Sequence, residues 1–188
     1  MHAASHRYVL TGSPIWRAAT EAEREAVLAA VGRNTTIFRL ELVNSFINDP
    51  LCSCLAEALR TNGHVTCLNL ESNSIQSVGI EALAAMLRAN TTLKELKLAN
   101  QHLGFAQASE ETFAAALEEN TSLLHLTIDL RNLRARELIN KWLTRNHELQ
   151  REQRKRDGIV TDVSRLRTAN SLRAASAPLT VSAPPPHG

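Results

Sequence analysis

The sequence predicts an α/β solenoid in which short parallel strands alternate with helices, and three observations support this fold class. An asparagine recurs at nearly regular intervals, at Asn34, Asn62, Asn90, Asn120 and Asn146. A strand-like leucine pattern follows each of the first four asparagines, and a helix-like pattern precedes all five. A single unit of such a repeat buries its apolar face only by stacking on its neighbours, so we expect the copies to lie side by side.

The strands are predicted from apolar side chains that stand three, six and eight positions after each asparagine. The last two of each set alternate with polar residues, as in a strand with one buried face. The four sets are Ile37, Leu40 and Leu42; Val65, Leu68 and Leu70; Leu93, Leu96 and Leu98; and Leu123, Leu126 and Ile128. Their agreement predicts four coils in one repeating frame.

The helices are predicted from apolar residues seven and three positions before each asparagine, which is the spacing of one helix face. The pairs are Val27 and Val31, Leu55 and Leu59, Leu83 and Leu87, Phe113 and Leu117, and Ile139 and Leu143. Each asparagine therefore stands where a helix ends and the chain turns back into a strand. Asparagine tolerates the left-handed backbone conformation found at many helix ends, so we expect that conformation at Asn90 and its equivalents.

The pattern L-x-x-L-x-L followed by LESNSI is that of a long leucine-rich repeat, and it predicts a solenoid like that of ribonuclease inhibitor. Short parallel strands would line the concave side, and helices would cover the convex side. An asparagine in the turn after the strand is expected to bond to the backbone. Only Asn73 occupies that position, and Ser45, Gln101 and Arg131 replace it in the other coils.

Three regions are predicted along the chain. Residues 1–18 are expected to form a flexible N-terminal segment, and residues 19–157 are expected to form the leucine-rich-repeat domain. Residues 158–188 are rich in Ser, Ala and Pro and contain few large apolar side chains, so they are expected to be a disordered tail.

A helix is expected to cap the solenoid at each end. Thr20 and Glu23 form the capping-box pattern at the start of a helix over residues 20–33, and no strand is expected before this helix. The closing helix is expected over residues 134–156, and Gly158 is expected to end it.

The composition favours an intracellular protein without a strongly charged partner. Its 21 basic and 19 acidic side chains give a net charge of only +2, which does not point to nucleic acid or to an anionic membrane. The three cysteines, Cys52, Cys54 and Cys67, are odd in number, and the first two are too close in sequence to bridge comfortably. No signal-peptide or membrane-spanning pattern is present, so the cytoplasm and the cytoskeleton are the expected locations.

Neither catalysis nor a cofactor is expected. The seven histidines are scattered, and the sequence contains no glycine-rich phosphate loop and no recognisable combination of Ser, His and an acid. Cys52, Cys54, His64 and Cys67 carry ligand types that suit zinc, but their spacing lacks paired C-x-x-C motifs. We therefore expect these cysteines to behave as small apolar side chains rather than as metal ligands.

Three segments resemble the leucine-rich-repeat region of the tropomodulin and leiomodin family. They are LNLESNSIQSVGIEALAAMLRANTTLKELKLANQ, LEENTSLL and RNHELQREQRK, and the resemblance covers residues 20–156. It implies the same repeat fold and a noncatalytic activity of binding actin, with effects on capping or organisation at the pointed end of the filament. The tropomyosin-binding N-terminal half of the family has no counterpart in residues 1–18, so tropomyosin is not an expected partner.

By the same resemblance, the actin-binding residues lie in one turn and on the terminal helix. The candidates are Asn100, Gln101, Arg145, Glu148, Arg151, Arg154, Lys155 and Arg156. The charge run REQRKRD is equally typical of a solvated helix end, where cations are stabilised.

An alternative function is that of a general adaptor that binds another protein through its concave face. The outward-facing side chains of the strands would form this face, and they are mixed in charge: Arg39, Glu41, Thr66, Asn69, Glu95, Lys97, His125 and Thr127. Polar alternation of this kind is also what a solvated strand face requires.

Overall fold

The computed structural model describes the backbone of residues 6–175 and the side chains of residues 6–158. The chain divides into two compact units after Glu148. Strands and helices alternate in the order β1 (His6–Val9), α1 (Pro14–Ala18), α2 (Glu21–Val31), β2 (Ile37–Glu41), α3 (Asp49–Arg60), β3 (Cys67–Asn69), α4 (Ser77–Ala89), β4 (Glu95–Lys97), α5 (Gln107–Glu119), β5 (His125–Thr127) and α6 (Leu133–Ala175).

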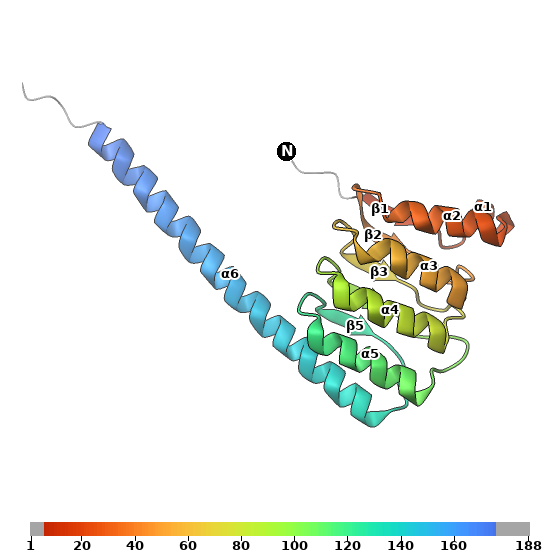
Figure 1. The fold of residues 1–188 in the computed structure, drawn as a ribbon. Coiled ribbons are helices and arrows are strands. Elements are labelled where there is room, and N and C mark those ends of the chain that lie inside the picture. Colours follow the sequence, from red (N-terminus) through yellow and green to blue (C-terminus); the bar gives the residue numbers. More distant parts are fainter. Residues whose placement is uncertain (1–5, 176–188) are drawn as a thin grey trace, which may run out of the picture. The chain divides into compact units, whose positions relative to one another are not determined.

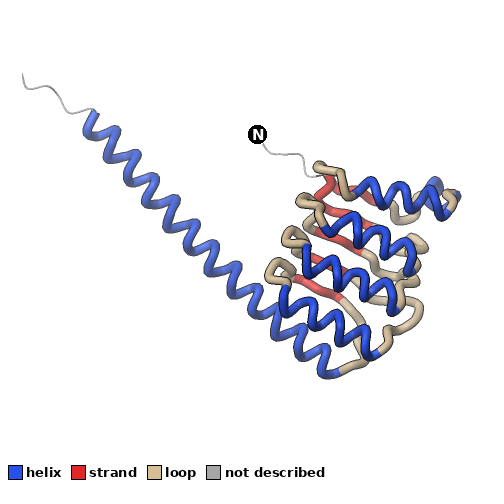
Figure 2. The backbone as a smooth tube through the Cα atoms, in the orientation of Figure 1, coloured by secondary structure: helices blue, strands red, loops and turns tan. Residues whose placement is uncertain are grey.

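The strands of the first unit form one parallel sheet in the order β1-β2-β3-β4-β5, which is also their order in the sequence. Helices α2, α3, α4 and α5 lie side by side along this sheet, as Figure 1 shows, and consecutive helices contact one another. Figure 2 shows the strands and the helices as two separate layers of the first unit. The predicted leucine-rich-repeat solenoid is confirmed.

The register of the strands explains the leucine pattern. Leu40, Leu68, Leu96 and Leu126 are paired with one another across four strands. The first three are almost fully buried and belong to one aliphatic core, and Leu126 packs against that core. Repeating the same side chain once in every coil therefore builds a continuous apolar column through the solenoid.

The asparagines that end the helices do not adopt the expected left-handed conformation. Asn90 has φ −81° and ψ 125°, which is extended backbone. Its side-chain amide donates to the carbonyl oxygens of Leu59 (2.7 Å) and Asn62 (3.2 Å), and its Oδ1 accepts from the N–H groups of Thr92 and Leu93 at 2.8 Å each. The predicted left-handed conformation was therefore wrong. Asparagine suits this position because its side-chain amide bonds to the preceding coil.

The same bonds recur along the solenoid and form a ladder of buried amides. Asn62 donates to Val31 and Asn34 of the coil before it, and Asn120 donates to Leu87 and Asn90. Asn146 on α6 ends the ladder by donating to the carbonyls of Asn120 (3.0 Å) and Leu123 (2.8 Å). Among the described residues, every buried side-chain nitrogen and oxygen has a hydrogen-bond partner.

A second, shorter ladder follows the strands. The amide nitrogen of Asn73 donates to Leu42 and Leu70, as predicted, and its oxygen accepts from the N–H groups of Ser45 and Ile47. Gln101 performs the same role one coil later: its amide donates to Leu70 and Leu98 and accepts from Ile75. The substitution of Gln for Asn therefore preserves the ladder.

The segment expected to be flexible at the N-terminus contains two ordered elements within its described part. Strand β1 pairs in parallel with β2, so the prediction that no strand precedes the N-terminal capping helix was wrong. The short helix α1 buries Trp16 to 4% exposure. The indole Nε1 of Trp16 donates to the carbonyl of Ser45 at 2.7 Å, which ties α1 to the first coil. Residues 1–5 of that predicted segment lie outside the described residues.

The predicted start of the first capping helix is confirmed, but the predicted end of the closing helix is not. The capping box at the start of α2 is confirmed, because Thr20 accepts from the N–H of Glu23 while the Glu23 carboxylate accepts from the N–H of Thr20. Helix α6 does not end at Gly158 but continues to Ala175. Glycine weakens a helix without forbidding it, and good helix formers precede Gly158.

The predicted disordered tail falls partly on α6 and partly on residues 176–188, which lie outside the described residues. No helix in the described part of the chain is long and apolar enough to cross a membrane.

Candidate protein-binding surfaces

The turns that lead from strands to helices form a regular row in the first unit. Asn44, Ser72 and Asn100 stand at the same position of successive coils and share a left-handed backbone, with φ of 48°, 58° and 59°. The N–H of Asn44 donates to the carbonyl of Glu71, and that of Ser72 donates to Ala99, both at 3.1 Å. Each turn is therefore held by the next one along the solenoid.

The third turn of this row contains two of the residues predicted to bind actin. Asn100 is exposed, and its N–H donates to Oδ2 of Asp129 at 2.7 Å, so a carboxylate replaces the carbonyl used by the other turns. Gln101 is half-buried, and the second ladder already occupies its amide. Within this turn, Asn100 offers the exposed side chain and Gln101 supports its backbone.

Arg145 lies on α6 at the end of α5, where its guanidinium bonds to the protein itself. Its Nη1 donates to the carbonyl of Glu118 at 2.7 Å, and its Nη2 donates to those of Leu117 (3.0 Å) and Asn120 (2.8 Å). The guanidinium also lies 4.7 Å from the ring centroid of Trp142. A cation on the last carbonyls of a helix stabilises that helix end, so Arg145 closes the solenoid.

The remaining residues predicted to bind actin are exposed, and they are divided between the two units. Glu148 is the last residue of the first unit. Arg151, Arg154, Lys155 and Arg156 belong to the second unit, where Arg156 lies 3.7 Å from Glu152 one helical turn earlier. An exposed pair of this kind contributes little energy, so these cations remain available to a partner. Their role in binding stays a prediction.

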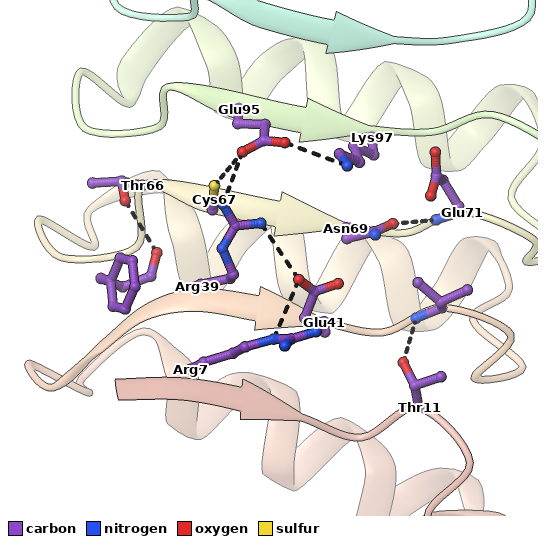
Figure 3. A network of polar contacts seen from close by, with 12 residues as sticks. Arg7, Thr11, Arg39, Glu41, Thr66, Cys67, Asn69, Glu71, Glu95 and Lys97 are labelled. Carbon is purple, nitrogen blue, oxygen red and sulfur yellow. Dashed lines mark hydrogen bonds and ion pairs between the residues drawn. The ribbon is translucent and has the colours of Figure 1, made fainter. Parts of the chain in front are cut away.

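The outward face of strands β2 to β4 carries a network of paired charges, shown in Figure 3. Arg39 lies between two carboxylates, with Nη1 3.4 Å from Glu41 and Nη2 3.1 Å from Glu95. Lys97 approaches Glu95 at 3.5 Å, and Arg7 of β1 approaches Glu41 at 3.6 Å. The sequence could not place Arg7 in this network, because β1 lacks the leucine pattern that revealed the other strands.

The Cys67 thiol belongs to the same network and is held in its protonated form. It donates to Oε2 of Glu95 at 2.6 Å. Burial, together with this hydrogen bond, raises the pKa of the thiol to about 12. The bond from Cys67, with the nearby charges of Arg39 and Lys97, lowers the pKa of the Glu95 carboxyl below its ordinary value. A protonated thiol is a poor nucleophile and a poor metal ligand.

The other cysteines have separate environments. Cys52 is fully buried in the core and donates to the carbonyl of Gly79 at 3.6 Å, whereas Cys54 donates to the carbonyl of Glu25. Across the residues that the structure describes, no group of three or more His, Cys, Asp or Glu side chains could hold a metal ion.

Comparison with known proteins places this repeat architecture in a family. A family model described as the TMOD/LMOD leucine-rich domain matches residues 17–149. The chain belongs to this tropomodulin and leiomodin family. The match runs from the end of α1 into the first part of α6 and includes strands β2 to β5, so it confirms the resemblance that the sequence segments indicated.

Two relatives show that this chain corresponds to only part of the length of other family members. Human tropomodulin-4 is 35% identical over 127 residues, which are 68% of this chain and 37% of the relative. Rat leiomodin-2 is 35% identical over 125 residues, which are 66% of this chain and 23% of the relative. The chain thus spans about a third of the tropomodulin and about a quarter of the leiomodin.

Two solved structures share the fold. One, described as leiomodin-1 actin-binding site 2, superposes with a TM-score of 0.73 at 30% identity and covers 77% of this chain and 83% of its own. The C-terminal domain of a Caenorhabditis elegans tropomodulin superposes with a TM-score of 0.72, covering 81% of this chain and 90% of its own. Its 24% identity supports the fold alone.

Proposed function

We propose that the chain is a noncatalytic actin-binding domain that influences capping or organisation at the pointed end of actin filaments. The observation that carries this proposal is the likeness to leiomodin-1 actin-binding site 2, at 30% identity over most of both chains. The family membership of residues 17–149 supports it, because the matched region is the leucine-rich domain itself.

The contact residues are divided between the strand-to-helix turns and the basic segment of the second unit. In the turn row, Asn100 is exposed, its N–H is held by Asp129, and Gln101 donates to the carbonyls of Leu98 and Ala99 just before it. The basic segment presents four exposed cations close together in the sequence, with the acidic Glu152 among them. They are Arg151, Arg154, Lys155 and Arg156. Cations of this kind speed the approach to an acidic partner and make binding depend on salt.

Actin co-sedimentation with a charge variant tests this proposal. Replacing Arg151, Arg154, Lys155 and Arg156 by serine is expected to lower the affinity for filaments by about tenfold or more at low salt. A matched control replaces four exposed arginines of the first unit, Arg33, Arg60, Arg88 and Arg134, and is expected to retain most of the affinity. Equal losses of affinity in both variants would show that binding depends on net charge and not on these four residues. The proposal would be rejected if the unchanged chain did not bind actin.

The adaptor alternative depends on the concave face, whose charges are already paired with one another. Arg39, Glu41, Glu95 and Lys97 neutralise each other across three strands. A charged partner would have to compete with these pairs and desolvate them, which favours the turns and the basic segment as the contact surfaces. Replacing Arg39 by serine separates the two functions, because only an adaptor that uses the concave face would lose its partner.

A further inference from the structure

The turn between β2 and α3 contains a bulky residue in an unfavourable backbone conformation. Phe46 has φ 57° and is 50% exposed. Left-handed backbone is uncommon for a large side chain and costs energy, and such outliers concentrate at functional sites. Burial of the side chain does not fully offset this cost, because Phe46 remains half exposed.

The repeat shows that the aromatic ring is not required by the fold. Phe46 stands twelve positions after Asn34, and the corresponding positions of the next three coils hold Ser74, His102 and Asn132. All three are polar, and none of them has a positive φ. The first coil therefore departs from the common turn both in its side chain and in its backbone.

Two arginines from the N-terminal helices lie over this ring. The guanidinium of Arg17 is 5.6 Å from the ring centroid of Phe46, and that of Arg24 is 5.8 Å away. Arg24 is held in place, because its Nε donates to the carbonyl of Trp16 and its Nη2 donates to that of Arg17. The ring and the two cations thus form one cluster built from α1, α2 and the first turn.

The positive charges of this cluster have no acidic partner within the described residues. Neither Arg17 nor Arg24 forms an ion pair there, whereas Arg7, Arg39, Arg60 and Arg88 each do. A guanidinium over an aromatic face is weakly hydrated, and its free N–H groups can still donate to a carboxylate of another protein. The cluster therefore fits a surface that combines carboxylates with an apolar recess.

The position of Phe46 connects this cluster to the candidate contact in the turn row. Phe46 shares its turn with Asn44, which begins the row that continues through Ser72 to Asn100. Neighbouring strands of a sheet are about 4.8 Å apart, so β2 and β4 are separated by about 10 Å at the sheet. A single protein surface can cover both turns, since a standard interface buries about 800 Å² on each partner.

We propose that Phe46, Arg17 and Arg24 form an anchor point for actin at the N-terminal end of the turn row. This inference rests on the proposed function, and it names the chemistry of the contact: the ring enters an apolar recess, and the two guanidiniums pair with carboxylates at its rim. Aromatic and arginine side chains contribute a large share of binding energy at protein interfaces. The rigid turn presents the ring in advance, so little side-chain entropy is lost on binding.

The test compares Phe46→Asn with the unchanged chain in actin co-sedimentation and in thermal unfolding. Asparagine tolerates the left-handed backbone, so the melting temperature is expected to stay equal or to rise, while the affinity for actin falls about fivefold or more. Val27→Asn, at a 39% exposed position on α2, is the matched control and is expected to leave the affinity unchanged.

Arg17→Ser gives a second readout that does not depend on the backbone of the turn. The Arg17 side chain is exposed and packs on Phe46, so its replacement is expected to leave folding intact, to lower the affinity about threefold and to weaken the salt dependence. Wild-type affinity in both variants would overturn the anchor point and leave the proposed function standing. Failure of the unchanged chain to bind actin would remove both, and self-association lost with Phe46 would assign the cluster to a second copy instead.

Discussion

The two edges of the solenoid are built on the same repeat but obey different constraints. Where helices lead into strands, Asn62, Asn90 and Asn120 are buried, and their amides bond to backbone groups of the preceding coil and of the following turn. Asn146, which lies within α6, adds the last bonds of this ladder. Where strands lead into helices, the turn residues vary and several are exposed. Hydrogen bonds join the coils at both edges, but the asparagines of the first edge are buried, whereas the turns of the second edge also expose residues, such as Asn100, that a partner can recognise.

The largest effect is expected at the buried edge. Asn90→Ala would remove the acceptor of the Thr92 and Leu93 N–H groups and the donor to the Asn62 carbonyl, whereas the Leu59 carbonyl would keep its bond from the Asn62 N–H. Because each buried polar group left unsatisfied costs about 1–3 kcal/mol, we expect a loss of about 4 kcal/mol in the free energy of unfolding, measured by urea titration. A loss below about 1 kcal/mol would show that water or a shift of the chain replaces the amide.

Arg145 tests whether the closing cap belongs to the same set of stabilising bonds. Arg145→Ala removes three hydrogen bonds to the end of α5 and the packing on Trp142. We expect a loss of about 2 kcal/mol in the free energy of unfolding, since these bonds involve a cation. Arg134→Ala, at an exposed position on the same helix, is the control, and an equal loss in both variants would contradict a capping role.

The concave face, which lies between the two edges, is expected to respond to pH. The folded state lowers the pKa of Glu95, so the carboxylate stabilises the fold at pH values above its ordinary pKa of 4.5, and this contribution is lost as the pH falls below that value. Glu95→Gln should therefore reduce the dependence of the melting temperature on pH between about pH 3 and pH 6. Superimposable pH profiles for the two chains would show that ionisation of Glu95 does not contribute to the stability of the fold.

The smallest effect on stability is expected at the exposed edge. Asn100→Gly keeps a residue that adopts positive φ, so the free energy of unfolding should change by no more than about 0.5 kcal/mol. The affinity for actin should nevertheless fall by about two- to fivefold, because an exposed contact is lost. A large loss of stability here, comparable to that of Asn90→Ala, would remove the distinction between the two edges.

Sequence reasoning identified the repeating frame because leucine spacing is a local signal that every coil repeats. It also identified Asn73, the capping box of Thr20 and Glu23, and the family. It failed on the role of Asn90, because the decisive bonds reach back to Leu59 and Asn62 in the preceding coil. A single coil considered alone shows an asparagine at a helix end, for which left-handed backbone is the ordinary explanation.

Other features could not be predicted because they depend on contacts between distant segments. Strand β1 has four exposed residues and no leucine pattern, and it is recognisable only through its pairing with β2. The bonds of Arg145 and Gln101 likewise depend on which carbonyls the neighbouring coils present. For the candidate site, the sequence supplied the exposed cations of the second unit, but the cluster at Phe46 required Arg17 and Arg24 to be placed in space.

The proposed function requires this leucine-rich domain to act on the pointed end of actin filaments. Elongation of pyrene-labelled actin from seeds capped at their barbed ends measures this activity directly. We predict that the unchanged chain alters the elongation rate in a dose-dependent manner up to about 50 μM, a range that detects even a micromolar complex. An elongation rate that stays constant over this range, with the chain folded throughout, would contradict the claim.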